Sequence, residues 1–399
     1  MTNRIYLCLA HMSGKEQDFV KEAFDTNWVV PLGPNVNGFE EDLKLFVGGR
    51  NEVVVLSAGT AAVHLALIAC GVTPGDEVIV QSFTFCASSH PIAYLGAKPV
   101  FVDSEMDTWN MDPELLEIAI KDRIEKTGKK PKAIVPVYLY GMPAKIDEII
   151  AIAEKYDIPV IEDAAEGFGS KYNGQMCGTF GKYGVLSFNG NKMITTSGGG
   201  ALITPSANDK KEIMFYATQA REAYPYYQHE NIGYNYRMSN ICAGIGRGQM
   251  TVADEHISHH KHIQKMYEEL LADIKGVTIH SQPSALRVRG QENAYQVVVQ
   301  GAVGGAAGVT HEARELHTDC EPNANVEAMR IFLDTKGIES RPLWKPMHKQ
   351  PVYADADAYV NGVSENLFKV GMCLPSGPCV TDDEVRYIVE CIKEAILVG

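Results

Sequence analysis

Short apolar runs alternate with stretches of helical periodicity through the middle of the chain. Each run has the length of a buried strand and is followed by small or polar residues, after which apolar positions recur every three to four residues. The runs lie at 53–56, 75–80, 99–102, 132–137, 159–161 and 201–204, and helical spacing fills intervals such as 61–70, 112–120 and 147–155. The helix at 112–120 is predicted to begin with Asp112 as its cap, followed by an early proline. Strands that alternate with helices favour an α/β fold, in which helices cover both faces of a mainly parallel sheet.

Helical patterns without strands between them flank this region. Two short helices are predicted before the first strand, and a long helix is predicted over 240–275. The long segment contains Gly244, Gly246 and Gly248, each of which weakens a helix by about 1 kcal/mol relative to alanine, so close packing against another helix is the expected reason. A final helix is predicted over 381–398. We expect a large domain over 1–250 and a smaller α+β domain over 251–399.

Composition and charge narrow the classes of function. The chain has 399 residues and a formal net charge of −14, which argues against nucleic-acid binding. No basic segment followed by an apolar core begins the sequence, and no apolar run has membrane-spanning length, so we expect a cytoplasmic protein without membrane contact. Nine cysteines without a Cys-x-x-Cys motif are interpreted as reduced core residues rather than disulfides or zinc ligands.

Two other patterns receive plain interpretations. Four histidines crowd one predicted helix (His256, His259, His260 and His262), but no carboxylate or cysteine completes a metal shell. We therefore predict that they lie on a solvated face and that the protein binds no metal. The glycines of 301–308 have the wrong spacing for a dinucleotide-binding fingerprint, and a flexible loop is the favoured interpretation.

The candidate chemistry lies in 187–200, which reads Ser-Phe-Asn-Gly-Asn-Lys-Met-Ile-Thr-Thr-Ser-Gly-Gly-Gly. A lysine in a glycine-flanked, partly desolvated turn can lose its proton and attack a carbonyl, although a surface loop with a charged tip is the ordinary alternative. Upstream, Asp163 ends the apolar run at 159–161, and groups just beyond a strand of a parallel sheet face the ligand crevice. Lys192 and Asp163 are therefore interpreted as the carbonyl-bonding amine and the pyridinium partner that pyridoxal 5′-phosphate (PLP) requires.

A phosphate site is predicted earlier in the chain. The strand at 53–56 passes through Ser-Ala-Gly-Thr into an apolar helix, and the free N–H groups at a helix N-terminus bind phosphate. Such a turn is also an ordinary helix cap. Together with Lys192 and Asp163, it leads us to assign Gly59 and Thr60 to the PLP phosphate. His64, one turn further on, is interpreted as a packed helix residue.

Several motifs carry a resemblance to a known family. Residues 162–170 (Glu-Asp-Ala-Ala-Glu-Gly-Phe-Gly-Ser), 178–181 (Gly-Thr-Phe-Gly) and 187–192 resemble the DegT–DnrJ–StrS sugar aminotransferases, and the likeness extends from 31–33 to 374–377. The sequence of residues 187–200 is most similar to the corresponding segment of the 4-aminotransferases of the UDP-N-acetylbacillosamine route. The resemblance implies a fold-type-I PLP-dependent transferase, with a mainly parallel seven-stranded sheet flanked by helices and a smaller C-terminal domain.

The resemblance also implies roles for individual residues. Phe85 and Ala165 would enclose the PLP ring, Glu166 would lie near its phenolic oxygen, and Ser187 would join Gly59 and Thr60 at the phosphate. Asn235 would reach across a homodimer to the partner's cofactor, so that the active sites are shared. Arg341, Lys345 and His348 match a segment that lines the active-site entrance and supply positive charge for a diphosphate or a carboxylate, although such residues alone would usually be a solvated stretch. Tyr138 stands where the family commonly has histidine and receives no catalytic role. Ala294, Tyr295 and Gln296 depart from the family pattern.

The implied reaction is transamination of a nucleotide-linked 4-keto-6-deoxy sugar with L-glutamate as the amino donor. The expected acceptor is UDP-2-acetamido-4-keto-2,6-dideoxyglucose, which would become a 4-amino sugar for glycan or polysaccharide biosynthesis. Use of GDP-4-keto-6-deoxymannose is one alternative, and a PLP-binding regulator without turnover is another. A family dehydratase would carry histidine in place of Lys192. The sequence does not separate the sugars, the nucleotides or the configuration of the new amine.

Overall fold

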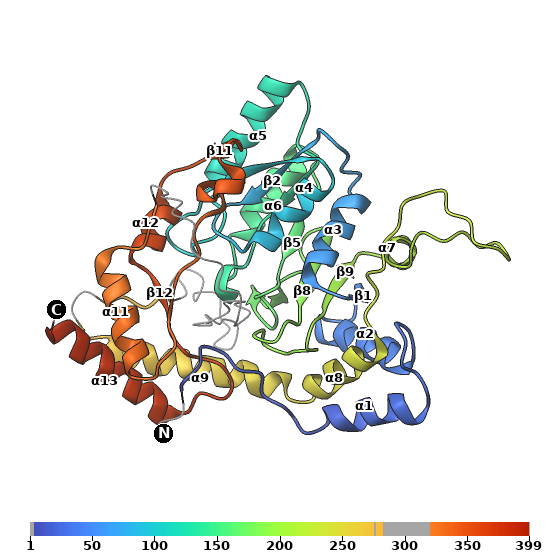
Figure 1. Cartoon of the computed structure of the whole chain (residues 1–399). Coiled ribbons are helices and arrows are strands. Elements are labelled where there is room, and N and C mark those ends of the chain that lie inside the picture. Colours follow the sequence, from blue (N-terminus) through green and yellow to red (C-terminus); the bar gives the residue numbers. More distant parts are fainter. Residues whose placement is uncertain (1–3, 275–276, 282–319, 399) are drawn as a thin grey trace.

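A sheet forms the centre of the molecule (Figure 1). The computed structural model describes residues 4–274, 277–281 and 320–398. Seven strands of the sheet come from residues 52–204: β1 (Glu52–Leu56), β2 (Glu77–Gln81), β3 (Lys98–Val102), β4 (Ala133–Val135), β5 (Ile161–Asp163), β8 (Tyr183–Ser187) and β9 (Gly200–Thr204). A short strand from the C-terminal part, β11 (Ala358–Tyr359), pairs with β3.

The strand order makes the sheet continuous and mainly parallel. Hydrogen bonding defines the orders β1-β9-β8-β5 and β11-β3-β2-β4. Two parallel bridges, Ile134 to Val160 and Val137 to Asp163, join β4 to β5. Strand β9 is antiparallel to both neighbours, with Thr204 opposite Glu52 of β1. The predicted α/β fold is therefore confirmed, with seven strands from residues 52–204 and β11 added at one edge.

Helices cover both faces of the sheet, as the alternation of strands and helices predicted. They are α2 (Pro34–Phe46), α3 (Gly59–Ala69), α4 (His90–Tyr94), α5 (Pro113–Thr127), α6 (Ile146–Lys155) and α7 (Ala207–Ala217). Helix α1 (Glu16–Asp25) lies further out, against the helix that begins at Asn240 (Figure 1). Because successive strand residues point to opposite faces, Val53 and Val55 join the core formed with α2, α5 and α6. Val54 and Leu56 join the second core, formed with α3 and α7.

The predicted helix over 240–275 is wrong as a single element. The structure has α8 (Asn240–Met250) and α9 (Ala253–Leu271), separated at Thr251. The Thr251 hydroxyl donates to the carbonyl oxygen of Gly248 at 2.6 Å, and such local bonding competes with helix continuation. The explanation given for the glycines is confirmed: a Cβ on Gly246 would lie 2.6 Å from the Phe39 ring, and one on Gly248 would lie 2.6 Å from the Glu16 nitrogen.

A smaller core lies among α9, α11 (Ala324–Thr335) and α13 (Asp382–Val398), on the left in Figure 1. Ile5 packs into it, and its backbone bridges to Ile338. The short strands β10 (Arg341–Pro342) and β12 (Met372–Cys373) pair beside it. The division of the chain near residue 250 stays a proposal.

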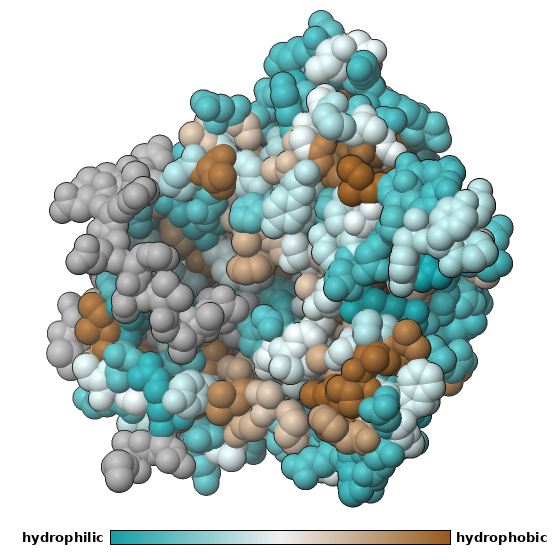
Figure 2. Space-filling view, turned by 45° about the vertical axis from the view of Figure 1, so that its right-hand side comes forward, coloured by the Kyte–Doolittle hydropathy of each residue, from teal (hydrophilic) through white to brown (hydrophobic). Residues whose placement is uncertain are grey.

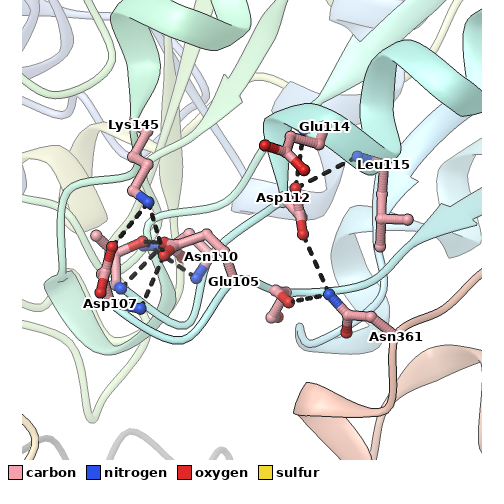
Figure 3. Close-up of polar contacts among 10 residues, drawn as sticks. Glu105, Asp107, Asn110, Asp112, Glu114, Leu115, Lys145 and Asn361 are labelled. Carbon is pink, nitrogen blue, oxygen red and sulfur yellow. Dashed lines mark hydrogen bonds and ion pairs between the residues drawn. The ribbon is translucent and has the colours of Figure 1, made fainter.

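Hydrogen bonds fasten the C-terminal part to the segment that follows β3, and Figure 3 shows the one between Asn361 and Asp112. Asp103, which follows β3, accepts hydrogen bonds from the backbone N–H of Gly362 at 2.9 Å and of Ser364 at 3.2 Å, where α12 (Val363–Val370) begins. The side-chain amide of Asn361 donates to Asp112 at 3.1 Å. Asp112 also caps α5, as expected. In the segment after β3, the carboxylates of Glu105 and Asp107 pair with Lys145, at 3.1 Å and 2.8 Å respectively.

The histidines of α9 do not lie on a solvated face, so that prediction is wrong. His256 is 3% exposed and His260 is fully buried, because both take positions on the side of α9 that packs inward. His262 is the exposed one and pairs with Asp382 at 2.8 Å. His64 is buried within α3, as predicted. The glycine run at 301–308 and residues 294–296 lie outside the described residues.

The surface is hydrophilic over much of the face drawn in Figure 2, with hydrophobic residues gathered in separate patches. Exposed large hydrophobic residues are concentrated in 28–32 and in the loop around 224–232. Within the described ranges, none of the helices has the length and apolar character needed to cross a bilayer. No disulfide joins any of the nine cysteines, all of which lie within the described residues. Four are buried, four are half-buried and Cys379 is exposed, so the expected core placement is found for only part of them.

Candidate active site

The carboxyl ends of four parallel strands bring the predicted site residues to one edge of the sheet. Strand β5 ends at Asp163, β8 ends at Ser187, and β1 leads through 57–58 into α3. Strand β2 leads into the loop that contains Phe85. In open α/β sheets, this edge is where ligands bind.

Lys192 points to a buried carboxylate. Its Nζ lies 3.2 Å from Oε1 of Glu166, and only 12% of the lysine side chain is exposed. The backbone N–H of Lys192 donates to the Asn189 carbonyl, so the lysine lies in a tight turn after β8. The alternative of a charged loop tip in solvent is therefore excluded by the burial of this side chain.

Asp163 is held in a fixed orientation at the end of β5. Its Oδ2 accepts from the Ser88 hydroxyl at 2.6 Å, and its Oδ1 accepts from the backbone N–H of Ala165 at 3.1 Å. Burial raises the pKa of Asp163, and the hydrogen bond from Ser88 opposes this effect. A cation placed beside the carboxylate would favour the ionised form further.

Glu166 is similarly buried and anchored. Its Oε2 accepts from the backbone N–H of Tyr140 at 2.8 Å, while burial raises the pKa of the carboxyl group and Lys192 lowers it. Tyr140 has a left-handed backbone with φ 53°, an uncommon conformation for a residue with a side chain. Its phenolic oxygen accepts from the backbone N–H of Trp344 at 3.0 Å, so it links this loop to the C-terminal part.

Gly59 and Ser187 lie side by side at the start of α3. A Cβ on Gly59 would lie 3.1 Å from the Ser187 Cβ, and one on Gly200 would lie 2.4 Å from the Gly59 nitrogen. Helix α3 has an extended Ala58 as its N-cap, without a side-chain cap. The first N–H groups of α3, including that of Thr60, are thus offered to an anion beside the Ser187 hydroxyl.

Phe85 presents a partly exposed ring to the same edge. The ring is 43% exposed, and its centroid lies 5.6 Å from that of Trp344. Trp344 also lies 5.2 Å from the ring of Tyr140. Ala165 is half-buried and directly follows the Asp163 strand end. An aromatic face and a small residue beside Asp163 are suited to a planar ring.

The remaining predicted residues have other surroundings. Asn235 is exposed, and its backbone bridges to Thr218 at the base of the loop that extends to the right beyond α7 in Figure 1. Arg341 is exposed and pairs with Glu339 at 3.2 Å, whereas Lys345 is mostly buried and lies 3.5 Å from Glu321.

His348 is buried between two protein partners. Its Nδ1 lies 2.6 Å from the Ser82 hydroxyl, and its Nε2 lies 3.2 Å from Glu365. The structure does not bring Asn235 or Arg341 into contact with Lys192 within this chain. The predicted roles of all four residues stay predictions.

The sequence reasoning missed three residues of this site. Ser88 and Tyr140 hold the two buried carboxylates, yet neither stands in a motif that indicates such contacts. Asn191 precedes Lys192, and neither atom of its buried amide has a hydrogen-bond partner in the described structure. Its place in the lysine motif was the available signal. Tyr138 is buried and donates to Glu162, which fits the absence of a catalytic assignment.

The residues of this edge fit PLP. The cofactor requires an amine for its carbonyl, an acid for its ring nitrogen and N–H donors for its phosphate. Lys192, Asp163 and the start of α3 supply these groups, and the Phe85 ring offers a face for stacking. The amide of Asn191 adds a buried polar group for which the described part of the chain offers no hydrogen-bond partner.

Comparisons with known proteins point the same way. The model of the family described as "DegT/DnrJ/EryC1/StrS aminotransferase family" matches residues 11–393. "Putative pyridoxal phosphate-dependent aminotransferase EpsN" of Bacillus subtilis (strain 168) is 44% identical over 98% of this chain and 96% of its own length. "GDP-perosamine synthase" of Escherichia coli O157:H7 is 36% identical over 96% of both chains.

Two other proteins extend the comparison. "UDP-2-acetamido-2-deoxy-3-oxo-D-glucuronate aminotransferase" of Pseudomonas aeruginosa (strain PAO1) is 38% identical over 90% of this chain and 89% of its own length. Among solved structures, a DegT DnrJ EryC1 StrS aminotransferase from Brucella abortus superposes with a TM-score of 0.82 at 28% identity, over 96% of this chain and 95% of that one.

Proposed function

The chain belongs to the DegT/DnrJ/EryC1/StrS aminotransferase family and is a PLP-dependent enzyme, and from this membership we propose that it aminates a nucleotide-linked 4-keto-6-deoxy sugar. L-Glutamate is the proposed amino donor, and the product is a 4-amino sugar for glycan or polysaccharide biosynthesis in the cytoplasm. The single observation that supports this best is the meeting of Lys192, Glu166 and Asp163 at the carboxyl edge of the sheet.

PLP, when bound, supplies an electron sink for the carbon that loses its proton and carries the amino group between donor and acceptor. Lys192 is the proposed general base and general acid. Its amine takes the proton from the donor's α-carbon and delivers a proton to C4′ of the cofactor. Its turn after β8 restricts where its amine can reach, and Glu166 orients that amine through the 3.2 Å contact.

Asp163 acts on the ring side of the proposed site. Its carboxylate, fixed by Ser88, would hold a proton on the ring nitrogen. The N-terminus of α3 and Ser187 would bind the phosphate, and Phe85 and Ala165 would exclude water from the two ring faces. Each of these residues would bind or orient the cofactor, and none of them would transfer a proton to or from the substrate.

The nucleotide diphosphate needs local positive charge, because a protein of net charge −14 does not attract an anion over long range. Arg341, Lys345 and His348 are the proposed contributors. Arg341 and Lys345 each have a carboxylate partner, Glu339 and Glu321 respectively. A diphosphate would therefore compete with those carboxylates for the two cations, a competition that favours an anion of high charge density.

UDP-2-acetamido-4-keto-2,6-dideoxyglucose is the proposed acceptor. One support is the sequence of 187–200, 219–221 and 341–348, which resembles that of the bacillosamine-route enzymes. A second is that the Pseudomonas relative is named for a UDP-sugar substrate. GDP-4-keto-6-deoxymannose is the second candidate, because the Escherichia coli relative is named a GDP-perosamine synthase and covers a larger share of this chain.

The deciding experiment compares kcat/KM for the two nucleotide sugars with purified, PLP-saturated enzyme. A higher value for the UDP sugar supports the proposal, whereas faster use of the GDP sugar replaces it. Release of 2-oxoglutarate from glutamate alone, in one equivalent per active site, separately tests the donor half of the reaction.

A homodimer with shared sites is part of the same proposal. Asn235 is exposed, which is the geometry required of a residue that serves the partner subunit. Mixing Lys192→Ala with Asn235→Ala subunits would create dimers with one intact site, so about a quarter of wild-type activity should return. Sedimentation as a monomer with full activity would contradict this arrangement.

A further inference from the structure

The backbone that follows Lys192 is anchored at two points by buried side chains. Nδ1 of His256, on α9, lies 3.0 Å from the Met193 carbonyl oxygen. The backbone N–H of Thr195 donates to Oε1 of Gln249, on α8, at 3.2 Å. His256 is 3% exposed and Gln249 is 1% exposed, so water does not compete for either contact. Side chains from two helices therefore hydrogen-bond to the backbone of the loop within three residues of Lys192.

Both anchors are in turn held by the N-terminal segment. Nδ1 of His11 lies 3.0 Å from Nε2 of His256, with the two rings nearly perpendicular. The amide nitrogen of Gln249 donates to the His11 carbonyl oxygen at 2.8 Å and to Glu16 at 2.7 Å. The carboxylate of Glu16 also accepts hydrogen bonds from the backbone N–H groups of Ser13 and Gly14. These bonds lie within the N-terminal segment itself.

The donors and acceptors permit one consistent assignment. The Met193 carbonyl can only accept, so the hydrogen of His256 is on Nδ1. Nε2 of a neutral His256 then accepts, and the N–H of His11 donates to it. Likewise, a flipped Gln249 amide would place its oxygen against two other oxygens, those of His11 and Glu16. Each side chain therefore has a single orientation.

We propose that His256 and Gln249 are positioning residues for Lys192, and that His11 locks His256 in the orientation this requires. The proposal rests on the proposed role of Lys192 as the amine that bonds to PLP. A displacement of about 1 Å at a reacting group can cost on the order of a hundredfold in rate. The amine of Lys192 also depends on its 3.2 Å contact with Glu166.

His11 is the residue to change, because it is exposed, lies outside the loop and has no contact with Lys192 itself. His11→Ala removes the donor to His256. His11→Asn keeps an N–H donor close to the place of Nδ1 and should restore it. His262→Ala, which removes an exposed histidine from the same helix α9, is the matched control.

The readout is the rate at which PLP bonds to the apoprotein, followed by visible absorbance, with borohydride trapping and mass spectrometry to locate the bond. We expect His11→Ala to slow attachment and to lower kcat by about tenfold, with KM for glutamate unchanged. His11→Asn should recover to within about threefold of wild type. His262→Ala should match wild type. All four apoproteins should remain folded without urea, with the midpoint of His11→Ala lowered by no more than the loss of one hydrogen bond to a buried group allows.

Unchanged attachment in His11→Ala, with PLP located on Lys192, would overturn the positioning proposal and leave the proposed function intact. Equal losses in His11→Ala and His11→Asn would also overturn it, since a donor would then not be the requirement. PLP located on another residue would instead refute the role of Lys192, and with it the proposed function.

Discussion

The amine of Lys192 and the carboxylate of Glu166 lie 3.2 Å apart, although their loops follow different strands of the sheet. Both side chains are almost fully shielded, with 12% and 2% exposed. A buried charge that loses its partner is costly, whereas loss of both charges removes the problem. Lys192→Met and Glu166→Gln should therefore each destabilise the apoprotein, and the double variant should be more stable than the sum of the two effects predicts. We expect a coupling of about 0.5–3 kcal/mol in urea unfolding. Additive effects would show that the two groups do not interact.

Lys192→Ala should abolish turnover and the visible absorbance of a lysine-bound cofactor. No other lysine amine is paired with Glu166 in the described structure, so no substitute for this bond is in place. Lys182→Ala is a matched control, because its amine lies over the Tyr183 ring, away from Glu166. Absorbance and activity that survive in Lys192→Ala would move the chemistry to another residue.

Asp163→Asn should retain PLP but lose most activity. The amide has nearly the same shape and can still accept from Ser88, but it carries no charge to hold a proton on the ring nitrogen. Losses of two or more orders of magnitude in kcat, with PLP retained through gel filtration, are expected for removal of a charge in a water-excluded site. Activity near wild type would mean that Asp163 does not face the ring.

Ser88→Ala should shift the pH profile rather than abolish activity. The Ser88 hydroxyl lowers the pKa of Asp163 against the raising effect of burial. Without it, the pKa of Asp163 rises further, so more of the carboxyl is protonated at a given acidic pH. The acidic limb of kcat/KM should therefore move to higher pH, with recovery on the alkaline side. Ser89→Ala, whose hydroxyl donates to the Cys86 carbonyl, should leave the limb in place.

His260 should make the protein less stable in acid. The residue is fully buried, neither ring nitrogen has a hydrogen-bond partner among the described residues, and burial lowers the pKa to about 3. The pKa of a histidine in the unfolded chain is about 6.5. Between these values, the unfolded chain binds a proton that the folded chain excludes. The free energy of unfolding should then fall with decreasing pH, by up to about 1.4 kcal/mol per unit from this residue.

His260→Leu should remove that contribution. Comparing urea unfolding of the apoproteins at pH 7 and pH 5 isolates it, because the other histidines of α9 remain in both proteins. A loss of stability on acidification that is equal in wild type and variant would show that His260 is not the residue responsible.

The sequence allowed correct predictions where the residues that determine a structural feature lie in one short segment. Asp163 and Lys192 stand at strand ends and in a glycine-flanked turn, and the structure brings both to one edge of the sheet. Asp112 was predicted as a helix cap from its position before Pro113, and it caps α5. Such features depend on neighbours in the sequence, so local chemistry reveals them.

Contacts between distant segments were beyond this reasoning. Ser88 and Tyr140 reach the carboxylates from loops whose own residues show no periodicity that indicates it. The break at Thr251 was missed because one hydroxyl bond ends a pattern that the apolar spacing continues. His256 and His260 were assigned to solvent from their polarity, although their helix positions face inward.

The pairing of β1 with β9 has a consequence for how the protein is made. Glu52 and Thr204 lie opposite each other in the finished sheet, yet 152 residues separate them. At about 5–20 residues per second on the ribosome, the first strand waits roughly 8–30 s before its neighbour is synthesised. During that interval, the valines of β1 have no strand beside them and are available to other unfinished chains. The yield of folded protein should therefore depend on how soon residue 204 emerges, and not only on the stability of the completed sheet.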